Sequence, residues 1–186
     1  PHPPFKTSTL QQAAANVLGW SAKKTMAVAQ RLYEKGSITY HRTDSLHIVE
    51  SAVAAIRKVI VAKYGAEHLP EKEIYYKTSG KVVAQEAHEG IRPTHIEEAE
   101  VSGEDIDRDE VKLYQLIWRR TVACQMKPAT VDQTVIWVMA ENEENYQLRA
   151  VGEVMKFPSW KKLYKLSDEV ILPEMSEGEK LTKEKV

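Results

Sequence analysis

The sequence predicts an α+β fold in which a mainly helical, winged-helix-like domain is followed by an antiparallel β segment. Through residues 1–126, apolar side chains recur at the spacing of amphipathic helices. After Pro128 they alternate with polar side chains at the two-residue spacing of strands. We therefore place a domain boundary near Met126, which gives a helical domain over 1–126 and a β-rich domain over 127–186.

The N-terminal region contains two predicted helices and a strand. Ser8 and Gln11 fit a capping box that starts the first helix, which stops at Gly19. Ser21 is placed to cap the second helix, and the β-branched and aromatic residues 37–40 then predict a short strand. This order of elements is typical of a winged-helix unit. Basic residues of the second helix are candidate phosphate contacts, although a helix surface also needs solvated charges: Lys23, Lys24, Arg31 and Lys35.

Two further helices complete the first domain. A periodic apolar pattern over 49–64 predicts a scaffold helix that stops at Gly65. Asp107 followed three residues later by Glu110 predicts the start of another helix, which ends near Lys127.

The β segment contains two predicted strands. The first covers 131–139, the polar residues 141–145 form a turn, and the second strand covers 146–155. Shorter β-like stretches surround Trp160 and residues 170–172.

Composition narrows the function classes. The 186-residue chain has a formal net charge of −1, so any positive charge that meets nucleic acid must be local. The single cysteine, Cys124, excludes a disulfide framework or a cysteine-ligated zinc site within this chain. No apolar run approaches the ~18 residues that span a bilayer, so we expect a cytoplasmic, nucleoid-associated protein. An opening at Pro1 without methionine suggests that the chain was cut from a longer one.

The segment 36–45 carries the chemistry. On a strand Tyr40 and Arg42 share a face, so a phenol and a guanidinium can meet one phosphate. A phenol has a pKa of about 10, so attack on a phosphodiester needs nearby positive charge, which Arg42 supplies.

Neighbouring residues can support that pair. Thr39 and Thr43 supply hydroxyls for phosphate oxygens, Asp44 can fix Arg42 through a charge-assisted hydrogen bond, and Ser45 is placed to cap the next helix. A lone Tyr-x-Arg on a strand usually means only a half-buried ring beside a solvated cation.

Four segments carry a family resemblance. The segment 38–45 resembles the active-site tyrosine segment of type IA DNA topoisomerases, and 85–94 resembles a second segment of these enzymes at family-like spacing. The segments 4–13 and 113–120 are similar to the bacterial topoisomerase I pattern. The resemblance covers residues 3–127 and fades beyond them.

The resemblance implies roles for individual residues. Tyr40 would attack a single-stranded DNA phosphodiester and form a 5′-phosphotyrosyl link, which allows relaxation of negative supercoils without ATP. Arg42 would stabilise the transition state, and His88 would act as a hydrogen-bond donor or proton relay. Arg92 could bind the DNA backbone or brace its loop by pairing with Glu86 or Glu89.

Two substitutions depart from the family pattern. His41 stands where bacterial enzymes often have methionine, and Gly90 stands where alanine is usual. Neither removes a chemical group that the mechanism needs.

The resemblance also implies parts that this chain lacks. The family uses a separate acidic domain that binds Mg²⁺, and no segment here resembles it. We therefore expect no metal or cofactor on this chain and no cleavage of DNA by this chain alone. His88, Glu89 and His95 do not have the spacing of a zinc helix. In the family the tyrosine domain is inserted in a β-rich hinge, so residues 127–186 are expected to be part of that hinge.

Two other function classes stay open. A winged-helix DNA-binding module without catalysis would use Tyr40 and Arg42 only as backbone contacts. A structural or protein-interaction domain explains the helices but not the two motif segments. The expected partners are single-stranded or negatively supercoiled DNA and the remaining domains of the parent chain, with no membrane.

Overall fold

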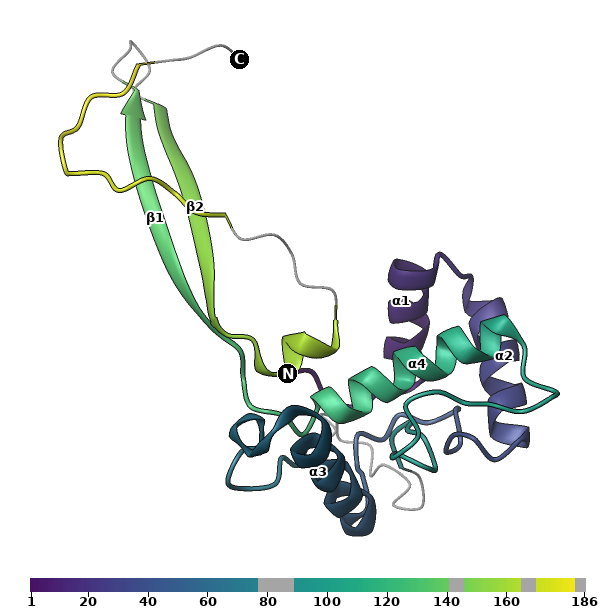
Figure 1. Ribbon diagram of the computed structural model, residues 1–186. Helices are drawn as coiled ribbons and strands as arrows, with labels where there is room; N and C mark the ends of the chain where they lie inside the picture. Colours follow the sequence, from purple (N-terminus) through teal and green to yellow (C-terminus); the bar gives the residue numbers. More distant parts are fainter. Residues whose placement is uncertain (77–88, 141–145, 165–169, 183–186) are drawn as a thin grey trace. The chain divides into compact units, whose positions relative to one another are not determined.

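A computed structural model describes residues 1–76, 89–140, 146–164 and 170–182 (Figure 1). The chain folds into two compact units, Pro1–Pro128 with Ser159–Lys165, and Ala129–Pro158 with Leu166–Val186. The described residues hold four α-helices and a two-stranded antiparallel sheet, which confirms the predicted α+β class. The sequence-based boundary near Met126 lies beside the end of the first stretch of unit 1. Assignment of the units to a tyrosine domain and a hinge stays a prediction.

Local capping signals explain several helix ends. The α-helices are α1 (Thr7–Leu18), α2 (Ala22–Glu34), α3 (Glu50–Tyr64) and α4 (Arg108–Ala123), with short 3₁₀ helices at η1 (Ala66–His68) and η2 (Ser159–Leu163). Gly19 ends α1 at φ 69°, a left-handed conformation that favours glycine. The Ser21 side chain accepts from the Lys24 amide, and Asp107 and Glu110 form the predicted capping box.

The start of α1 corrects one prediction. The helix begins at Thr7, so Ser8 and Gln11 lie inside it and do not form its capping box. The Lys6 amide instead donates to Thr9 Oγ1 at 3.1 Å. A threonine two positions after the helix start therefore satisfies the amide that precedes it.

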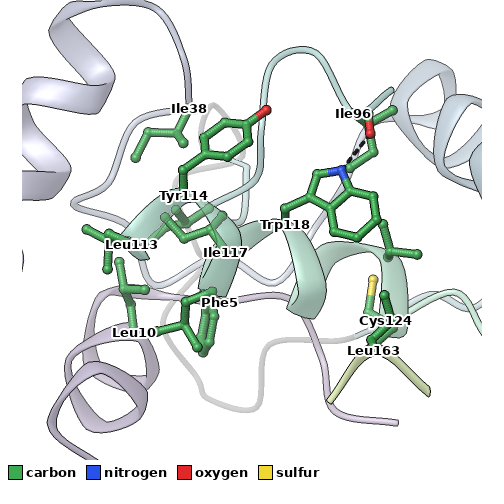
Figure 2. Close-up of a cluster of buried hydrophobic side chains, with 14 of the residues drawn as sticks. Phe5, Leu10, Ile38, Ile96, Leu113, Tyr114, Ile117, Trp118, Cys124 and Leu163 are labelled. Atoms are coloured by element: carbon green, nitrogen blue, oxygen red, sulfur yellow. Dashed lines mark hydrogen bonds between the residues drawn. The ribbon is translucent and has the colours of Figure 1, made fainter. Parts of the chain in front are cut away.

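The core of the first unit gathers around α4. This helix packs against α1, α2, α3 and η2. Figure 2 shows Leu113 and Ile117 of α4 together with Leu10 and Phe5, while the Trp118 indole donates to the carbonyl of Ile96. The largest fully buried side chains come from the four α-helices, from the segment before α1 and from the segments between helices: Phe5, Leu10, Leu32, Ile38, His41, Ile56, Ile60, Ile91, Leu113, Tyr114, Ile117 and Met126.

The predicted strand over 37–40 is wrong. Ile38 forms only an isolated antiparallel bridge with Pro93. Pairing stops on both sides of the bridge because the Ser37 amide donates to Leu32 at the end of α2, and the Arg92 amide donates to Thr39 Oγ1. Two amides that a longer ladder would use are thus taken by a helix end and a side chain.

The second unit is a β-ribbon. Strands β1 (Thr130–Ala140) and β2 (Tyr146–Phe157) pair antiparallel, as predicted, with Trp137 opposite Arg149. Val170 adds an isolated bridge to Glu153. The β-like stretch predicted around Trp160 is wrong, since it forms η2, whose Ser159 and Leu163 are buried in the first unit beside α4.

The described helices do not include a membrane span. None of them combines the length and the apolar character that crossing a bilayer requires.

Candidate active site

Tyr40 lies in the segment that joins α2 to α3. Its side chain is 38% exposed. The Tyr40 and Tyr33 rings pack edge to face, with their centroids 5.3 Å apart and their planes at 66°. Tyr33 belongs to the last turn of α2, so the end of that helix supports the Tyr40 ring while part of the phenol stays accessible to solvent.

The second motif segment lies directly against the first. The Thr39 amide donates to the Arg92 carbonyl at 2.9 Å, and the Thr94 amide donates to the Ser37 carbonyl at 3.1 Å. Thr39 Oγ1 donates to the Gly90 carbonyl at 2.8 Å. The residues joined are more than fifty positions apart in sequence, so the tertiary fold brings the two motif segments together.

Arg42 and Asp44 are both exposed. Within the part of the chain that the structure describes, no hydrogen bond or ion pair joins them, so the predicted fixing of Arg42 by Asp44 is wrong here. The reason is the backbone, because 40–45 is irregular and does not hold the side chains in strand alternation.

The hydroxyls of this segment form hydrogen bonds with backbone groups. Thr43 is 5% exposed, and its Oγ1 accepts from the Ser45 amide at 3.0 Å. Ser45 accepts from the His47 amide rather than capping α3, whose N-cap is Val49, so that capping prediction is wrong. Thr39 Oγ1 is bonded to the 90–92 backbone. DNA contacts from Thr39, Thr43 and Asp44 stay predictions.

Arg92 takes the bracing role that the sequence left open. Its guanidinium lies 2.7 Å from Glu89 Oε2, and a further nitrogen donates to the Pro93 carbonyl at 3.0 Å. The other oxygen of Glu89 accepts from the Val49 amide at 3.0 Å, at the start of α3. A carboxylate at that position is favoured by the helix dipole, so this ion pair also fixes the entry to α3. Contact of Arg92 with DNA stays a prediction.

Most basic residues of α2 and its C-cap pair with acids at the start of α4, its N-cap included. Lys24 lies 2.8 Å from Asp109 and 4.5 Å from the centroid of the Trp20 ring. Arg31 pairs with Asp107, and Lys35 pairs with the buried Glu110, each at 2.8 Å. Lys23 is exposed. DNA binding through Lys24, Arg31 or Lys35 would have to compete with these ion pairs. Among the interactions of the described residues, Lys23 makes no ion pair that DNA would have to displace.

His41 is a site residue to which the sequence assigned no chemistry. Its side chain is fully buried between Tyr33 and Tyr40, with ring centroids 5.8 and 5.4 Å away. Among described residues, neither ring nitrogen has a hydrogen-bond partner. Burial lowers the pKa of His41, Arg42 lowers it further, and Glu34 offsets part of the shift. The imidazole is therefore neutral near pH 7.

His88 lies outside the described residues, as do Gln85 and Glu86. The role of His88 near the phosphate therefore stays a prediction. Across residues 1–76, 89–140, 146–164 and 170–182, no group of three or more His, Cys, Asp or Glu side chains is placed to hold a metal ion.

Thr7 is a residue of the site that the sequence analysis did not identify. Thr7 Oγ1 donates to the carbonyl of His41 at 2.8 Å. It lies thirty-four residues before His41, and no local pattern marks that contact. The family-like segment 4–13 was the available signal, because it contains Thr7.

Comparison with known proteins gives consistent matches along the whole chain. A family model described as DNA topoisomerase matches residues 1–186. DNA topoisomerase 1 of Pasteurella multocida is 44% identical over 187 residues, which covers 98% of this chain and 21% of that protein. DNA topoisomerase 1 of Escherichia coli is 47% identical over 163 residues, covering 88% and 18%.

A solved structure agrees with these sequence matches. Full-length topoisomerase I from Thermotoga maritima matches with a TM-score of 0.77 and 34% identity, over 96% of this chain and 29% of that one. The present chain thus spans about a fifth of the length of the curated relatives it matches.

Proposed function

The chain belongs to the bacterial type IA DNA topoisomerases, and from this membership we propose that it carries the nucleophilic tyrosine of such an enzyme, Tyr40. The observation that best supports this is the placement of Tyr40. Its phenol is partly exposed, two residues from the solvated cation Arg42, on a segment tied by backbone hydrogen bonds to 90–94. A reactive oxygen and a positive charge thus share a constrained surface loop.

The proposed reaction is a transesterification. Tyr40 Oη attacks the phosphorus of one DNA strand, and the bond from phosphorus to the 3′-oxygen breaks. The phenol loses its proton, the leaving 3′-oxygen gains one, and the 5′-phosphate becomes joined to Tyr40. One phosphodiester replaces another, so the reverse attack by the 3′-hydroxyl reseals the strand without ATP. Passage of DNA through the break relaxes negative supercoils.

Arg42 and His88 are the proposed helpers. Charge on the non-bridging oxygens grows in the transition state, and a guanidinium beside them lowers the energy of that state. Arg42 is exposed and close in sequence to Tyr40, which supports this role. His88 is proposed as a donor to the phosphate or as a proton relay, because the pKa of a histidine lies near working pH.

We propose that Mg²⁺ binds to other parts of the protein. Among the described residues no group of three or more His, Cys, Asp or Glu side chains is placed to hold a metal ion, so no magnesium site is proposed on them. No step described for this chain passes through the metal. The acids that hold it, and the general acid for the 3′-oxygen, are expected outside this chain, since the chain covers only about a fifth of the curated relatives' length.

We propose that the two units correspond to two parts of the parent enzyme. Residues 1–126 are assigned to the tyrosine domain, with α1, α2 and the Ile38 bridge as its winged-helix-like portion, and residues 127–186 to the hinge, except that η2 groups with the first unit. An isolated two-stranded ribbon is marginal in water. The ribbon exposes large apolar side chains on both faces, which supports packing against other domains of the parent: Val135, Trp137, Met139, Tyr146 and Leu148.

The proposed substrate is single-stranded or negatively supercoiled DNA, met in the cytoplasm at the nucleoid. With a net charge of −1, the chain must bind phosphate through local cations. Lys23 and Arg42 are exposed and are the described cations best suited to this, whereas Lys24 first has to leave Asp109.

Replacing Tyr40 by Phe in the full-length protein tests the proposal. The ring and its packing on Tyr33 are kept, while the attacking oxygen is lost. We expect DNA binding to persist, and both plasmid relaxation and the covalent adduct on a denaturing gel to vanish. Tyr75→Phe is the matched control, because Tyr75 is an exposed tyrosine elsewhere in the same unit. Relaxation by Tyr40→Phe at the wild-type rate would instead support a winged-helix module without catalysis.

The purified 186-residue chain is expected to be inactive. No acidic metal-binding cluster is found among its described residues, so it should neither cleave a single-stranded oligonucleotide nor relax a plasmid in the presence of Mg²⁺. Detection of a DNA adduct on Tyr40 in this chain alone would contradict that expectation.

A further inference from the structure

We propose that Thr7, the first residue of α1, is a positioning residue that holds the backbone on both sides of Arg42 and thereby aims Arg42 and Tyr40 at the scissile phosphate. This inference rests on the proposed function of Tyr40. It concerns a side chain that touches no substrate and acts only through the 41–43 backbone.

The hydrogen bonds of Thr7 converge on one short segment. Its hydroxyl donates to the carbonyl of His41 at 2.8 Å and to that of Thr43 at 3.1 Å, a three-centre arrangement of one proton. The same oxygen accepts from the Thr43 amide at 2.9 Å, and the Thr7 amide donates to the Thr43 carbonyl at 2.9 Å. Thr7 thus holds the residues immediately before and after Arg42.

The segment has few other means of orienting Arg42. The Arg42 side chain is exposed, and within the described ranges it makes no ion pair with Asp44. The direction of a long exposed side chain then depends on where its backbone is held. Thr39 fixes the other end of the segment against 90–92, so Tyr40 and Arg42 lie between two anchored points.

The energetic logic is one of preorganisation. Electrostatic stabilisation is effective only when the cation is in place before charge develops. A displacement of about 1 Å in a reacting constellation can cost about 100-fold in rate. A hydroxyl that restrains the backbone under Arg42 should therefore affect the chemical step more than it affects binding.

Thr9 supplies a matched control on the same helical turn. Its hydroxyl donates to the Lys6 carbonyl and accepts from the Lys6 amide, both at 3.1 Å. Thr9→Val removes the same chemical group and a comparable set of local hydrogen bonds as Thr7→Val, but it leaves the 41–43 segment untouched.

The kinetic experiment uses full-length protein and a single-stranded oligonucleotide. The rate of covalent adduct formation is measured at saturating and subsaturating DNA for Thr7→Val, Thr7→Ser and Thr9→Val. We expect Thr7→Val to lower the saturating rate about 10- to 100-fold with an unchanged half-saturating concentration. Thr7→Ser keeps the hydroxyl and should restore the rate to within a few fold. Thr9→Val should react as the wild type does.

Amide exchange gives a second readout that needs no activity. The Thr43 amide donates to Thr7 Oγ1, so its hydrogen exchange should accelerate about tenfold in Thr7→Val and stay unchanged in Thr9→Val. If Thr7→Val does not fold, Thr7→Ala carries the same expectations, because it also removes the hydroxyl.

The outcomes separate two kinds of failure. If Tyr40→Phe in the same assay still forms an adduct, the proposed function itself is wrong. If Tyr40→Phe is inactive while Thr7→Val reacts as fast as Thr9→Val, or if Thr7→Ser fails to restore the rate, the positioning role is wrong and the function stands.

Discussion

The helical unit and the β-ribbon differ in how far their apolar side chains are buried. The first unit buries them in one cluster around α4, and that cluster includes Phe5, Ile38 and Ile91, which flank the candidate site. The ribbon leaves Trp137 and Leu148 more than half exposed. A site that needs fixed geometry is thus carried by the unit with an internal core, while the ribbon leaves large apolar side chains exposed, which agrees with the proposal that other domains of the parent protein cover them.

Opening the core of the helical unit should have the strongest consequence for stability. Ile117→Ala removes a fully buried side chain of α4 and should cost about 3 kcal/mol in the free energy of unfolding, since the cavity cannot fully collapse. Urea unfolding followed by circular dichroism measures it. Leu148→Ala on the ribbon should cost less than about 0.5 kcal/mol, because Leu148 is 59% exposed. Equal losses in the two variants would show that the two units do not differ in this way.

An ion pair with a buried carboxylate and an ion pair between two exposed side chains give the next contrast. Glu110 is 1% exposed, pairs with Lys35 and closes the capping box of α4. Glu110→Ala removes both the acceptor of the Asp107 amide and the partner of Lys35, and should cost about 2 kcal/mol. Asp132→Ala, which removes the exposed pair with Lys156 on the ribbon, should cost less than about 1 kcal/mol. The contrast is checked by chemical unfolding of both variants, and similar costs would argue against it.

A weaker effect is expected from protonation of His41, which should make the free energy of unfolding depend on pH. Its pKa is lowered in the folded state by burial and by Arg42, so the unfolded chain binds a proton at a higher pH than the folded chain. Stability contributed by neutral His41 is therefore present above the ordinary histidine pKa and is lost as pH falls below it. One such group changes stability by at most about 1.4 kcal/mol per pH unit.

His41→Met tests this by removing the titrating group from a site that packs aromatic rings. Unfolding free energies between pH 8 and pH 5 should fall less steeply in His41→Met than in the wild type. His95→Gln, an exposed histidine in the same unit, is the control and should keep the wild-type slope. An unchanged slope in His41→Met would show that protonation of His41 does not oppose folding.

Local signals predicted the secondary structure well where partners are near in sequence. Ser21 and the Lys24 amide are three residues apart, as are Asp107 and Glu110, so the caps of α2 and α4 are visible as short patterns. The alternation after Pro128 predicted the paired strands of the ribbon. At 37–40 the same reasoning was wrong, because the composition of a strand does not reveal that the Ser37 and Arg92 amides are already occupied.

For the candidate site, the residues could be named but their partners could not. The motif around Tyr40 pointed to the chemistry, and the bracing of Arg92 by Glu89 was one of two alternatives left open. The ion pairs between basic residues near α2 and acidic residues at the start of α4 were not predicted, because such partners lie far apart in sequence: Arg31 and Asp107 are 76 residues apart. The sequence also did not predict the burial of His41 or the hydrogen bonds of Thr7 to the 41–43 backbone.

From its residues alone, then, this chain specifies where α2 and α4 start, where α1 and α3 stop, which two stretches pair as the ribbon, and which phenol and guanidinium are candidates for phosphate chemistry. Folding decides what holds that phenol and guanidinium and which cations of α2 are already paired. The physical reason is range. Capping and periodicity act over three or four residues and leave a pattern, whereas hydrogen bonds and ion pairs between residues 34 to 76 apart form only when packing around α4 brings their backbones together.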